Sequence, residues 1–336
     1  MKKILLWLTA ILLFAAGFGL LVFPSVRSWM DEYRSSEVID GFRQDTGQSG
    51  AEAPKAGPES GELESISAES QDAEQGSADY GTLLREMREY NAKIYQEHQA
   101  SLVDAWSFEE DVFDLQSSGI QNDIAGYITI EAMDLQLPLY IGATEENMQK
   151  GAVVLGQTSM PVGGENTNCV IAAHRGYRGV PFFREIEKLQ PGDLVQVTNF
   201  QETLNYRVVK SIVINPDEID AIKILAGQDM VTLVSCHPYT ENYLRYLVYC
   251  VRDNTVSETE NTGESPQTAG ETEQQPLGLA AEDIPYEGIP YTSSEKAIRE
   301  EQLLNRVGLF LFAGLLVLVI IAVFAQRRGK RKRKKQ

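Results

Sequence analysis

The strongest constraint on the fold is a series of short apolar runs between residues 124 and 254. These runs are rich in β-branched and aromatic residues, and Gly and Pro separate them. About eight follow one another, at 127–130, 137–141, 152–155, 169–173, 194–197, 206–209, 231–234 and 246–249. Short strands at this spacing are typical of a closed β-barrel or a sandwich. Short helical segments are predicted between them, near 145–149, 181–189 and 218–225.

Acidic stretches lie on both sides of this region and are too polar to bury a core. Residues 45–79 hold nine acidic residues against Lys55 alone, and residues 256–276 hold five glutamates and no basic residue. They supply much of the net charge of −18. The only basic cluster lies in the C-terminal tail, whereas a phosphate-binding surface needs clustered Lys or Arg on the folded part. Nucleic acid is therefore excluded as a partner.

Two long uncharged apolar runs lie near the ends of the chain, at 4–23 and 307–325. About 19 apolar residues are enough to cross the hydrocarbon layer as a helix. Basic residues follow the second run directly, at 327–335, and such residues stay on the cytoplasmic side. The first run is either a cleaved secretory signal or a retained anchor, and its length favours the anchor. We expect a cell-membrane protein with both termini in the cytoplasm and the rest outside it.

A helix is predicted to lead into the β-rich region. Its apolar residues recur at helical spacing over 81–102 and include His98, which we read as a packing or surface residue. The predicted organisation is an N-terminal anchor or signal at 1–26, an acidic disordered linker at 27–79, a helix and a following loop at 80–123, the β-barrel domain at 124–254, an acidic linker at 255–305, a transmembrane helix at 306–326 and a basic cytoplasmic tail at 327–336.

The chain contains three cysteines, so one is left over in any pairing. Cys236 is the natural odd one, because Cys169 and Cys250 both lie in strand-like apolar runs. We expect those two to be buried free thiols, although a disulfide between them stays open at this point.

Three residues form a candidate site for acyl transfer. Cys236 and His174 each close a predicted strand, where side chains emerge at a barrel rim, and Arg245 begins the strand after Cys236. An antiparallel return would bring Arg245 back beside Cys236. A thiolate nucleophile, an imidazole that handles protons and a guanidinium that holds an oxyanion are the groups such chemistry needs. His237 adjoins Cys236, but neighbours on a strand point to opposite faces, so His174 is the expected base.

Three separated blocks carry a family resemblance. They are PVGGENTNCVIAAHRG at 161–176, TLVSCHPY at 232–239 and NYLR at 242–245. In order and spacing they resemble the sortases, and more narrowly the class C, pilus-assembling sortases, over about 126–252. The resemblance implies an eight-stranded sortase-type β-barrel with an N-terminal helix and lid, flanked by two transmembrane helices. It also implies that Cys236 is the nucleophile, His174 the general acid/base and Arg245 the oxyanion and substrate-positioning residue.

Class C sortases also carry a lid before the barrel, with an Asp-Pro-aromatic motif. The matching place here holds Asp104 and Trp106, with Ala105 where the proline is expected. The resemblance implies that Trp106 covers the thiol and Asp104 pairs with a cation; the alternative is that Trp106 packs the leading helix onto the barrel. Ser235 stands where the family has Thr before the cysteine, and is expected to keep a hydrogen bond to the substrate region.

The implied reaction is transpeptidation of a sorting signal of the Leu-Pro-any-Thr-Gly (LPXTG) type. Cys236 attacks the threonyl carbonyl, His174 protonates the leaving amine, and an amine resolves the thioester, with no metal or other cofactor. For class C the acceptor is a pilin lysine. The alternatives are a cell-wall-anchoring sortase that uses a peptidoglycan amine and, from another class, a non-catalytic membrane-tethered surface protein. The expected partners are pilins or surface proteins that carry such signals.

Overall fold

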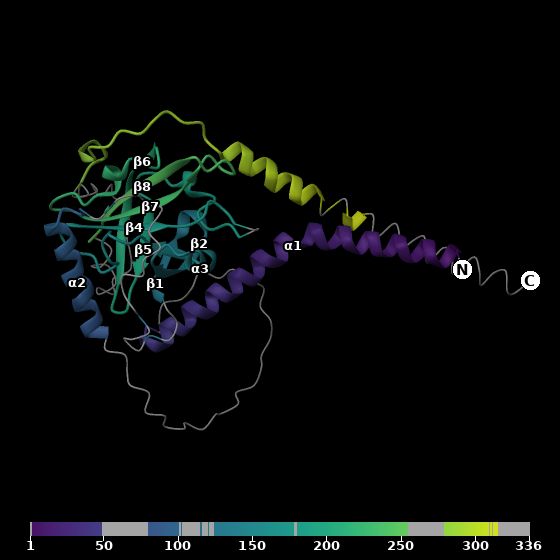
Figure 1. Ribbon diagram of the computed structural model, residues 1–336, viewed down its shortest axis with the longest axis horizontal. Coiled ribbons are helices and arrows are strands. Elements are labelled where there is room, and N and C mark those ends of the chain that lie inside the picture. Colours follow the sequence, from purple (N-terminus) through teal and green to yellow (C-terminus); the bar gives the residue numbers. More distant parts are fainter. Residues whose placement is uncertain are drawn as a thin grey trace, which may run out of the picture.

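A computed structural model describes residues 2–48, 80–100, 124–177, 180–254 and 279–308, together with 102, 115, 120, 310 and 312–314. Its centre is a closed barrel with the strand order β1-β2-β3-β4-β7-β8-β6-β5 (Figure 1). The strands are β1 (Ile124–Ile130), β2 (Leu135–Ile141), β3 (Ala152–Val154), β4 (Thr167–Ala172), β5 (Leu194–Thr198), β6 (Thr203–Ile214), β7 (Asp229–His237) and β8 (Leu244–Arg252). The predicted β-barrel of short strands is confirmed.

Two parallel strand pairs distinguish this barrel from a simple meander. β2 pairs with β3, and β4 pairs with β7, in parallel, while the other neighbours are antiparallel. Parallel neighbours end at the same rim of a barrel. The carboxyl ends of β4 and β7 therefore lie side by side, and this rim also receives the start of β8, because β8 returns antiparallel to β7.

Short helical segments connect the strands close to the predicted places. α3 (Glu145–Lys150) begins at Thr144, whose side chain accepts a hydrogen bond from the backbone N–H of Asn147 at 3.1 Å. That bond satisfies an N–H group that the first helical turn leaves without a partner. The remaining segments are the 3-10 helices η1 (Glu131–Met133), η2 (Ile186–Lys188), η3 (Ile219–Ile222) and η5 (Ala281–Asp283).

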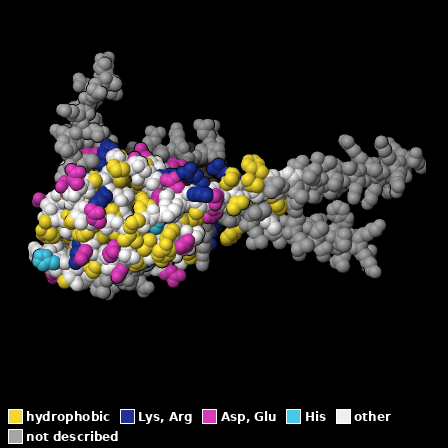
Figure 2. Space-filling model, turned by 90° about the horizontal axis from the view of Figure 1, so that it is seen from above, with side chains coloured by type: hydrophobic (Ala, Val, Ile, Leu, Met, Phe, Trp, Pro, Cys, Tyr) yellow, Lys and Arg dark blue, Asp and Glu magenta, His cyan; other side chains and the backbone are white. Residues whose placement is uncertain are grey.

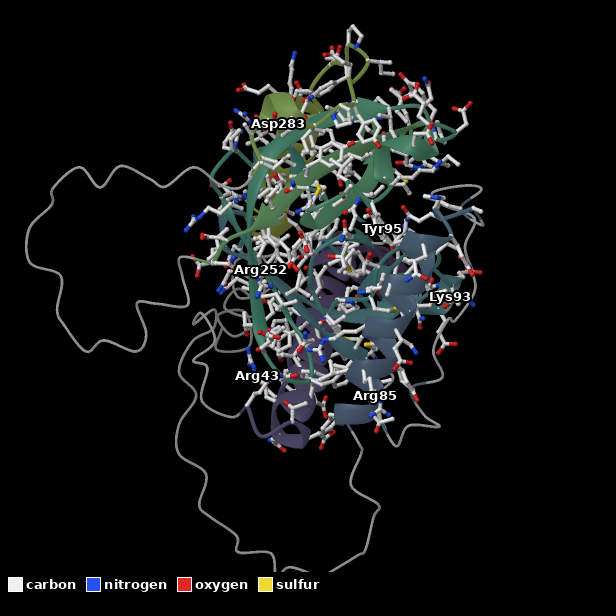
Figure 3. All side chains as sticks on the ribbon, turned by 90° about the vertical axis from the view of Figure 1, so that its left-hand side faces the viewer. Arg43, Arg85, Lys93, Tyr95, Arg252 and Asp283 are labelled. Atoms are coloured by element: carbon white, nitrogen blue, oxygen red, sulfur yellow. The ribbon has the colours of Figure 1, made fainter. Side chains whose placement is uncertain are left out.

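Two helices that precede β1 in the sequence pack against the barrel. α2 (Tyr80–Gln96) is the predicted amphipathic helix and buries Leu83, Met87 and Ile94 among other residues. α1 (Lys2–Asp45) reaches the barrel only with its last turns, where Ile39 and Phe42 are buried. Figure 3 shows Arg43 of α1 and Arg85 of α2 at the same end of the barrel.

Residues 27–45 therefore differ from the expected linker at 27–79, because they continue a helix whose end docks on the barrel. The apolar pair Ile39 and Phe42, three residues apart, supplies the contact. The part of that linker at 49–79 lies outside the described residues.

The two expected transmembrane helices find no support in the structure. Within the part of the chain that is described, no helix combines the length and the apolar character needed to cross a membrane. Most of the expected span at 306–326 and all of the tail at 327–336 lie outside the described residues.

A C-terminal segment, residues 284–294, packs along the barrel and is called the strap below. It runs beside the second half of β6, residues 208–214, which has no β5 neighbour. The N–H of Ile289 donates to the carbonyl of Val213 at 2.8 Å, and the side chain of Lys210 donates to the carbonyl of Ile284. The contact is close, since a Cβ on Gly288 would lie 2.8 Å from the Cβ of Ile212. Covering an open strand edge prevents pairing with another chain.

The strap continues into a helix that begins at residue 295 and leaves the barrel on the same side as α1 (Figure 1). The sequence placed residues 255–305 in an acidic linker. In the structure the described residues 279–305 instead form η5, the strap and this helix, with Leu279, Ile284 and Ile298 buried. Residues 255–278 of that linker lie outside the described part of the chain.

Candidate functional site

Cys236 lies at the carboxyl end of β7, on the barrel rim. It is partly buried, and the register of the antiparallel β7–β8 pair places it directly opposite Arg245. Side chains of directly opposed residues stand on the same face with Cβ atoms about 5 Å apart. The predicted return of Arg245 to the cysteine is thus present in the backbone.

His174 reaches the same rim from β4. The parallel ladder between β4 and β7 ends at the pair Ala172–Val234, and His174 and Cys236 each come two residues later. The imidazole stacks on Tyr177, with ring centroids 4.8 Å apart and an interplanar angle of 16°, and Phe182 contacts it edge-on. These aromatic rings fix the orientation of the imidazole.

Arg245 binds main-chain carbonyls of its own loop. Its Nη1 atom donates to the carbonyl of Asn242 at 3.1 Å and to that of Leu244 at 2.9 Å, and the residue is only 9% exposed. The charge of Arg245 acts on the Cys236 thiol, which it faces across the β7–β8 pair.

Burial sets the protonation of the two titrating groups. It raises the pKa of the Cys236 thiol above the ordinary 9.0, while the charges of Arg245 and Arg175 act in the opposite direction. Burial also lowers the pKa of His174 below 6.5. Both shifts favour the uncharged forms, so a neutral thiol beside a neutral imidazole predominates near pH 7.

The residues on either side of Cys236 are fully buried. The hydroxyl of Ser235 donates to the carbonyl of Ala173 at 2.9 Å, which ties β7 to β4. That bond uses the hydroxyl as a donor only, so the expected backbone or side-chain hydrogen bond of Ser235 to the substrate region stays a prediction. His237 lies on the face opposite Cys236, as predicted, where it contacts Glu187 and the strap residue Tyr291.

The expected lid lies outside the described residues. Asp104 and Trp106 fall in the stretch 103–114, for which the structure gives no description. The described residues on each side of it, Leu102 and Leu115, are both 4% exposed.

The sequence analysis missed a buried cluster behind Cys236. Arg175 is 3% exposed and donates from Nη1 to the carbonyl of Cys236 at 3.2 Å, and Nη2 forms an ion pair with Glu187. Glu187 in turn binds Ser293 and Ser294 of the strap. The one signal in the sequence was Arg175 itself, a charged residue directly after His174 at a strand end.

Two cavities of about 390 Å³ each are lined by other residues of the described structure. One includes Ser293 and Arg299, and the other, at the far end of β7 and β8 from Cys236, includes Gly163, Asp229 and Arg252. Within the described residues, no group of three or more His, Cys, Asp or Glu side chains is placed to hold a metal ion. All three cysteines are free thiols, as expected for Cys169 and Cys250.

Comparison with known proteins gives a consistent result. Residues 128–253 match the sortase domain family. Sortase A of Bacillus anthracis is 25% identical over 156 residues, which cover 46% of this chain and 72% of that protein. Sortase A of Streptococcus agalactiae is 25% identical over 152 residues, covering 44% of this chain and 60% of that protein. Among solved structures, Sortase C1 of GBS Pilus Island 1 is 26% identical with a TM-score of 0.51, over 69% of this chain and 96% of that chain.

Proposed function

The chain belongs to the sortase family, with its sortase domain at residues 128–253, and on that premise we propose that it is a pilus-assembling transpeptidase. It cleaves an LPXTG-like sorting signal between Thr and Gly and transfers the threonyl group to a pilin lysine. The observation that carries the proposal is the convergence of Cys236, His174 and Arg245 on one rim. The similarity to a sortase of a pilus island supports the choice of pilins.

The first step forms a thioester. The thiolate of Cys236 attacks the threonyl carbonyl, and the charge that develops on its oxygen is stabilised by the guanidinium of Arg245. His174 then gives a proton to the departing glycine amine. The carbonyl carbon exchanges its bond to nitrogen for a bond to sulfur, so the acyl group stays activated for the next step.

The reactive ion pair is a minor species in this scheme. Because burial raises the pKa of Cys236 and lowers that of His174, the thiolate–imidazolium pair forms only in a small fraction of molecules. That pair has both groups in the state that attack and leaving-group protonation require. The second step reverses the roles, since His174 accepts a proton from the incoming amine as that amine attacks the thioester.

We extend the proposal to the lid and to the membrane. Trp106 and Asp104 would cover Cys236 until a sorting signal displaces them.

The apolar runs at 4–23 and 307–325 would anchor the protein, with the catalytic domain outside the cell and both termini in the cytoplasm. The exposed side chains of Trp29, Leu303 and Leu304 support a membrane-proximal position, because hydrophobic side chains gather where the two helices leave the barrel (Figure 2). Proteolysis of intact cells tests this: a protected β-barrel domain contradicts it.

The decisive experiment uses the full chain in detergent with an LPXTG peptide. Intact mass spectrometry is expected to find the peptide, less its C-terminal part from Gly onward, attached to the parent or to Trp106→Ala, and nothing attached to Cys236→Ala. An adduct on Trp106→Ala alone also supports the lid. If no protein forms an adduct with any of several signal variants, the enzyme proposal fails and a non-catalytic surface protein takes its place.

The acceptor distinguishes the two enzymatic alternatives. After the adduct forms, a pilin lysine peptide and an amine that mimics the peptidoglycan cross-bridge are offered in competition. Preferential transfer to lysine supports pilus assembly, whereas preferential transfer to the cross-bridge amine supports anchoring to the cell wall.

A further inference from the structure

On the side of β4, the backbone of Cys236 is held by a side chain rather than by a strand, while on its other side β7 stays paired with β8. The β4–β7 ladder ends at Ala172–Val234, and the carbonyl of Val234 still accepts the N–H of Ala173 at 3.2 Å. The carbonyl of Cys236, two residues on, points to the same side, where no strand residue follows. Nη1 of Arg175 donates to it at 3.2 Å and takes the place of the missing strand.

Arg175 is itself fixed on two further sides. Its Nε atom donates to the carbonyl of Arg184 at 3.0 Å, and its Nη2 atom forms the buried ion pair with Glu187. The planar guanidinium thus binds three oxygens in a fixed geometry, which a lysine ammonium on its flexible stem does not reproduce.

The strap completes the carboxylate end of this chain of contacts. Glu187 accepts hydrogen bonds from the hydroxyl of Ser293 at 2.5 Å and from the N–H of Ser294 at 2.9 Å. Burial tends to raise the pKa of Glu187, but hydrogen bonds from His237, Ser293 and Arg175 and the charge of Arg175 outweigh it and lower the value to about 2. Glu187 is therefore a carboxylate at any pH at which the enzyme works.

The strap also holds the loop that follows the nucleophile. The N–H of Tyr239 donates to the hydroxyl of Ser294 at 3.0 Å, and Gln302 of the following helix donates to Glu185 at 2.8 Å. Contacts from the strap and its helix thus reach both the loop after Cys236 and the segment that carries Glu187.

We propose that Arg175 is a positioning residue that holds the backbone of Cys236 in its reactive place, and that the strap keeps Arg175 there through Glu187. This rests on the proposed role of Cys236 as nucleophile. It makes residues 284–294 part of the working domain rather than part of a linker. The competing explanation is an ion pair that only stabilises the fold, in which case a folded variant would react as the parent does.

The charged and titratable groups around Cys236 define what a variant changes. His174 and Arg175 approach from the end of β4 and Arg245 from β8, and Glu187 and His237 lie behind Arg175. The charge of Arg175 opposes the effect of burial on the pKa of Cys236. Loss of that charge is expected to raise this pKa, whereas loss of the geometry alone is expected to slow the reaction.

The test uses the full chain in detergent and two readouts. The first is the pH profile of iodoacetamide alkylation at Cys236, with Cys236→Ala as background. The second is kcat/KM for peptide cleavage. Arg175→Gln is expected to move the profile upward by about one pH unit and to lower kcat/KM about tenfold or more. Arg175→Lys keeps the charge, so its profile stays near that of the parent while kcat/KM still falls.

Two matched controls separate positioning from stability. Arg207→Gln removes an ion pair to Asp253, at 2.7 Å, at the opposite end of the barrel; its arginine side chain is 34% exposed, against 1% for Arg175, so it controls for the loss of an ion pair but not for burial. Thr292→Ala changes an exposed strap residue next to Ser293. Both are expected to retain the parent kcat/KM, whereas the double variant Ser293→Ala, Ser294→Ala loses part of it.

Parent-like kcat/KM and pH profile in folded Arg175→Gln overturn the proposal. If that variant does not fold, Arg175→Lys decides, because it keeps the charge but not the three-way geometry of the guanidinium, and parent-like kcat/KM there overturns the proposal. If the parent cleaves no peptide, the proposed reaction is refuted, and the plateau rate of alkylation at high pH decides the positioning role, because at that pH the thiol is ionised in every variant. A lower plateau in both Arg175→Lys and Arg175→Gln upholds the role, and a parent-like plateau in both overturns it.

Discussion

Cys236 and His237 are neighbours on β7, yet they lie in opposite environments. Cys236 is partly exposed on the rim beside Arg245, whereas His237 has no exposed surface and is enclosed by Glu187 and Tyr291. Because successive side chains of a strand point to opposite faces, one strand end serves both. The face that carries Cys236 and Arg245 is called the open face here, and the face that carries His237, Glu187 and Tyr291 the closed face.

The two arginines at this rim differ in the same way. Arg175 faces a carboxylate, and the ion pair is dry, with side-chain exposures of 1% and 4%. Arg245 donates to the main-chain carbonyls of Asn242 and Leu244 and lies directly opposite Cys236. We therefore expect a change at Arg175 to act through the backbone of Cys236, and a change at Arg245 to act on the proposed reaction directly.

The substitution expected to change the reaction most is at Arg245, on the open face. Arg245→Gln removes the charge beside Cys236, and kcat for cleavage of the sorting peptide is expected to fall by about 10²–10³, the usual cost of one oxyanion donor. Because Arg245 is only 9% exposed and donates to two main-chain carbonyls, a lower melting temperature is expected as well, so kcat is compared at a temperature at which the variant is fully folded.

Arg252→Gln is the matched control for that change, since Arg252 lies at the other end of β8. It is expected to retain the parent kcat. An equal loss of kcat in both variants would show that β8 responds as a whole, and would remove Arg245 from the chemistry.

On the closed face, a substitution of His237 is expected to lower the stability of the fold. His237→Ala leaves a cavity and removes the contact to Glu187 at 3.3 Å, so the free energy of unfolding is expected to fall by about 2–4 kcal/mol. Denaturant titration measures it. His98→Ala, at an exposed histidine, should stay within about 0.5 kcal/mol of the parent. A stable His237→Ala variant would mean that the closed face is not where stability resides.

The residues of the open face could be predicted from the sequence more fully than those of the closed face. The eight strand runs, the positions of His174 and Cys236 at strand ends and the return of Arg245 all follow from local pattern and from antiparallel pairing. They are properties of consecutive residues, which a sequence displays directly.

The closed face depends on partners far apart in the chain. Glu187 and Ser294 are 107 residues apart, and the strap follows an acidic stretch whose composition indicates a linker. Nothing local marks Ser293 and Ser294 as partners of a buried carboxylate. The docking of Ile39 and Phe42 was missed for the same reason, because two apolar residues in a polar helix reveal a contact only once the opposite surface is known.

The sensitivity of the fold to acid is expected to depend on Glu187, on the closed face. Glu187 has a pKa of about 2 in the folded chain against an ordinary value of 4.5, so its contribution to stability is complete above 4.5 and is lost as the pH falls toward 2. The melting temperature should fall more steeply over this window in the parent than in Glu187→Gln. Parallel curves for the two proteins would place the acid sensitivity elsewhere.

A substitution in the strap, with the smallest expected change in stability, tests whether the strap only covers the edge of β6 or also supports the backbone of Cys236. Gly288→Ala puts a methyl group 3.0 and 3.1 Å from the backbone N and O of Val213, so the strap must shift, at a cost of about 1–2 kcal/mol. Glu287→Ala, at the exposed neighbour, is the control and should leave stability unchanged. If the strap only covers the edge of β6, Gly288→Ala lowers the melting temperature and leaves kcat as it was. If the strap supports the backbone of Cys236 through Glu187 and Arg175, kcat falls as well, because one methyl group added to the strap then changes the position of Cys236.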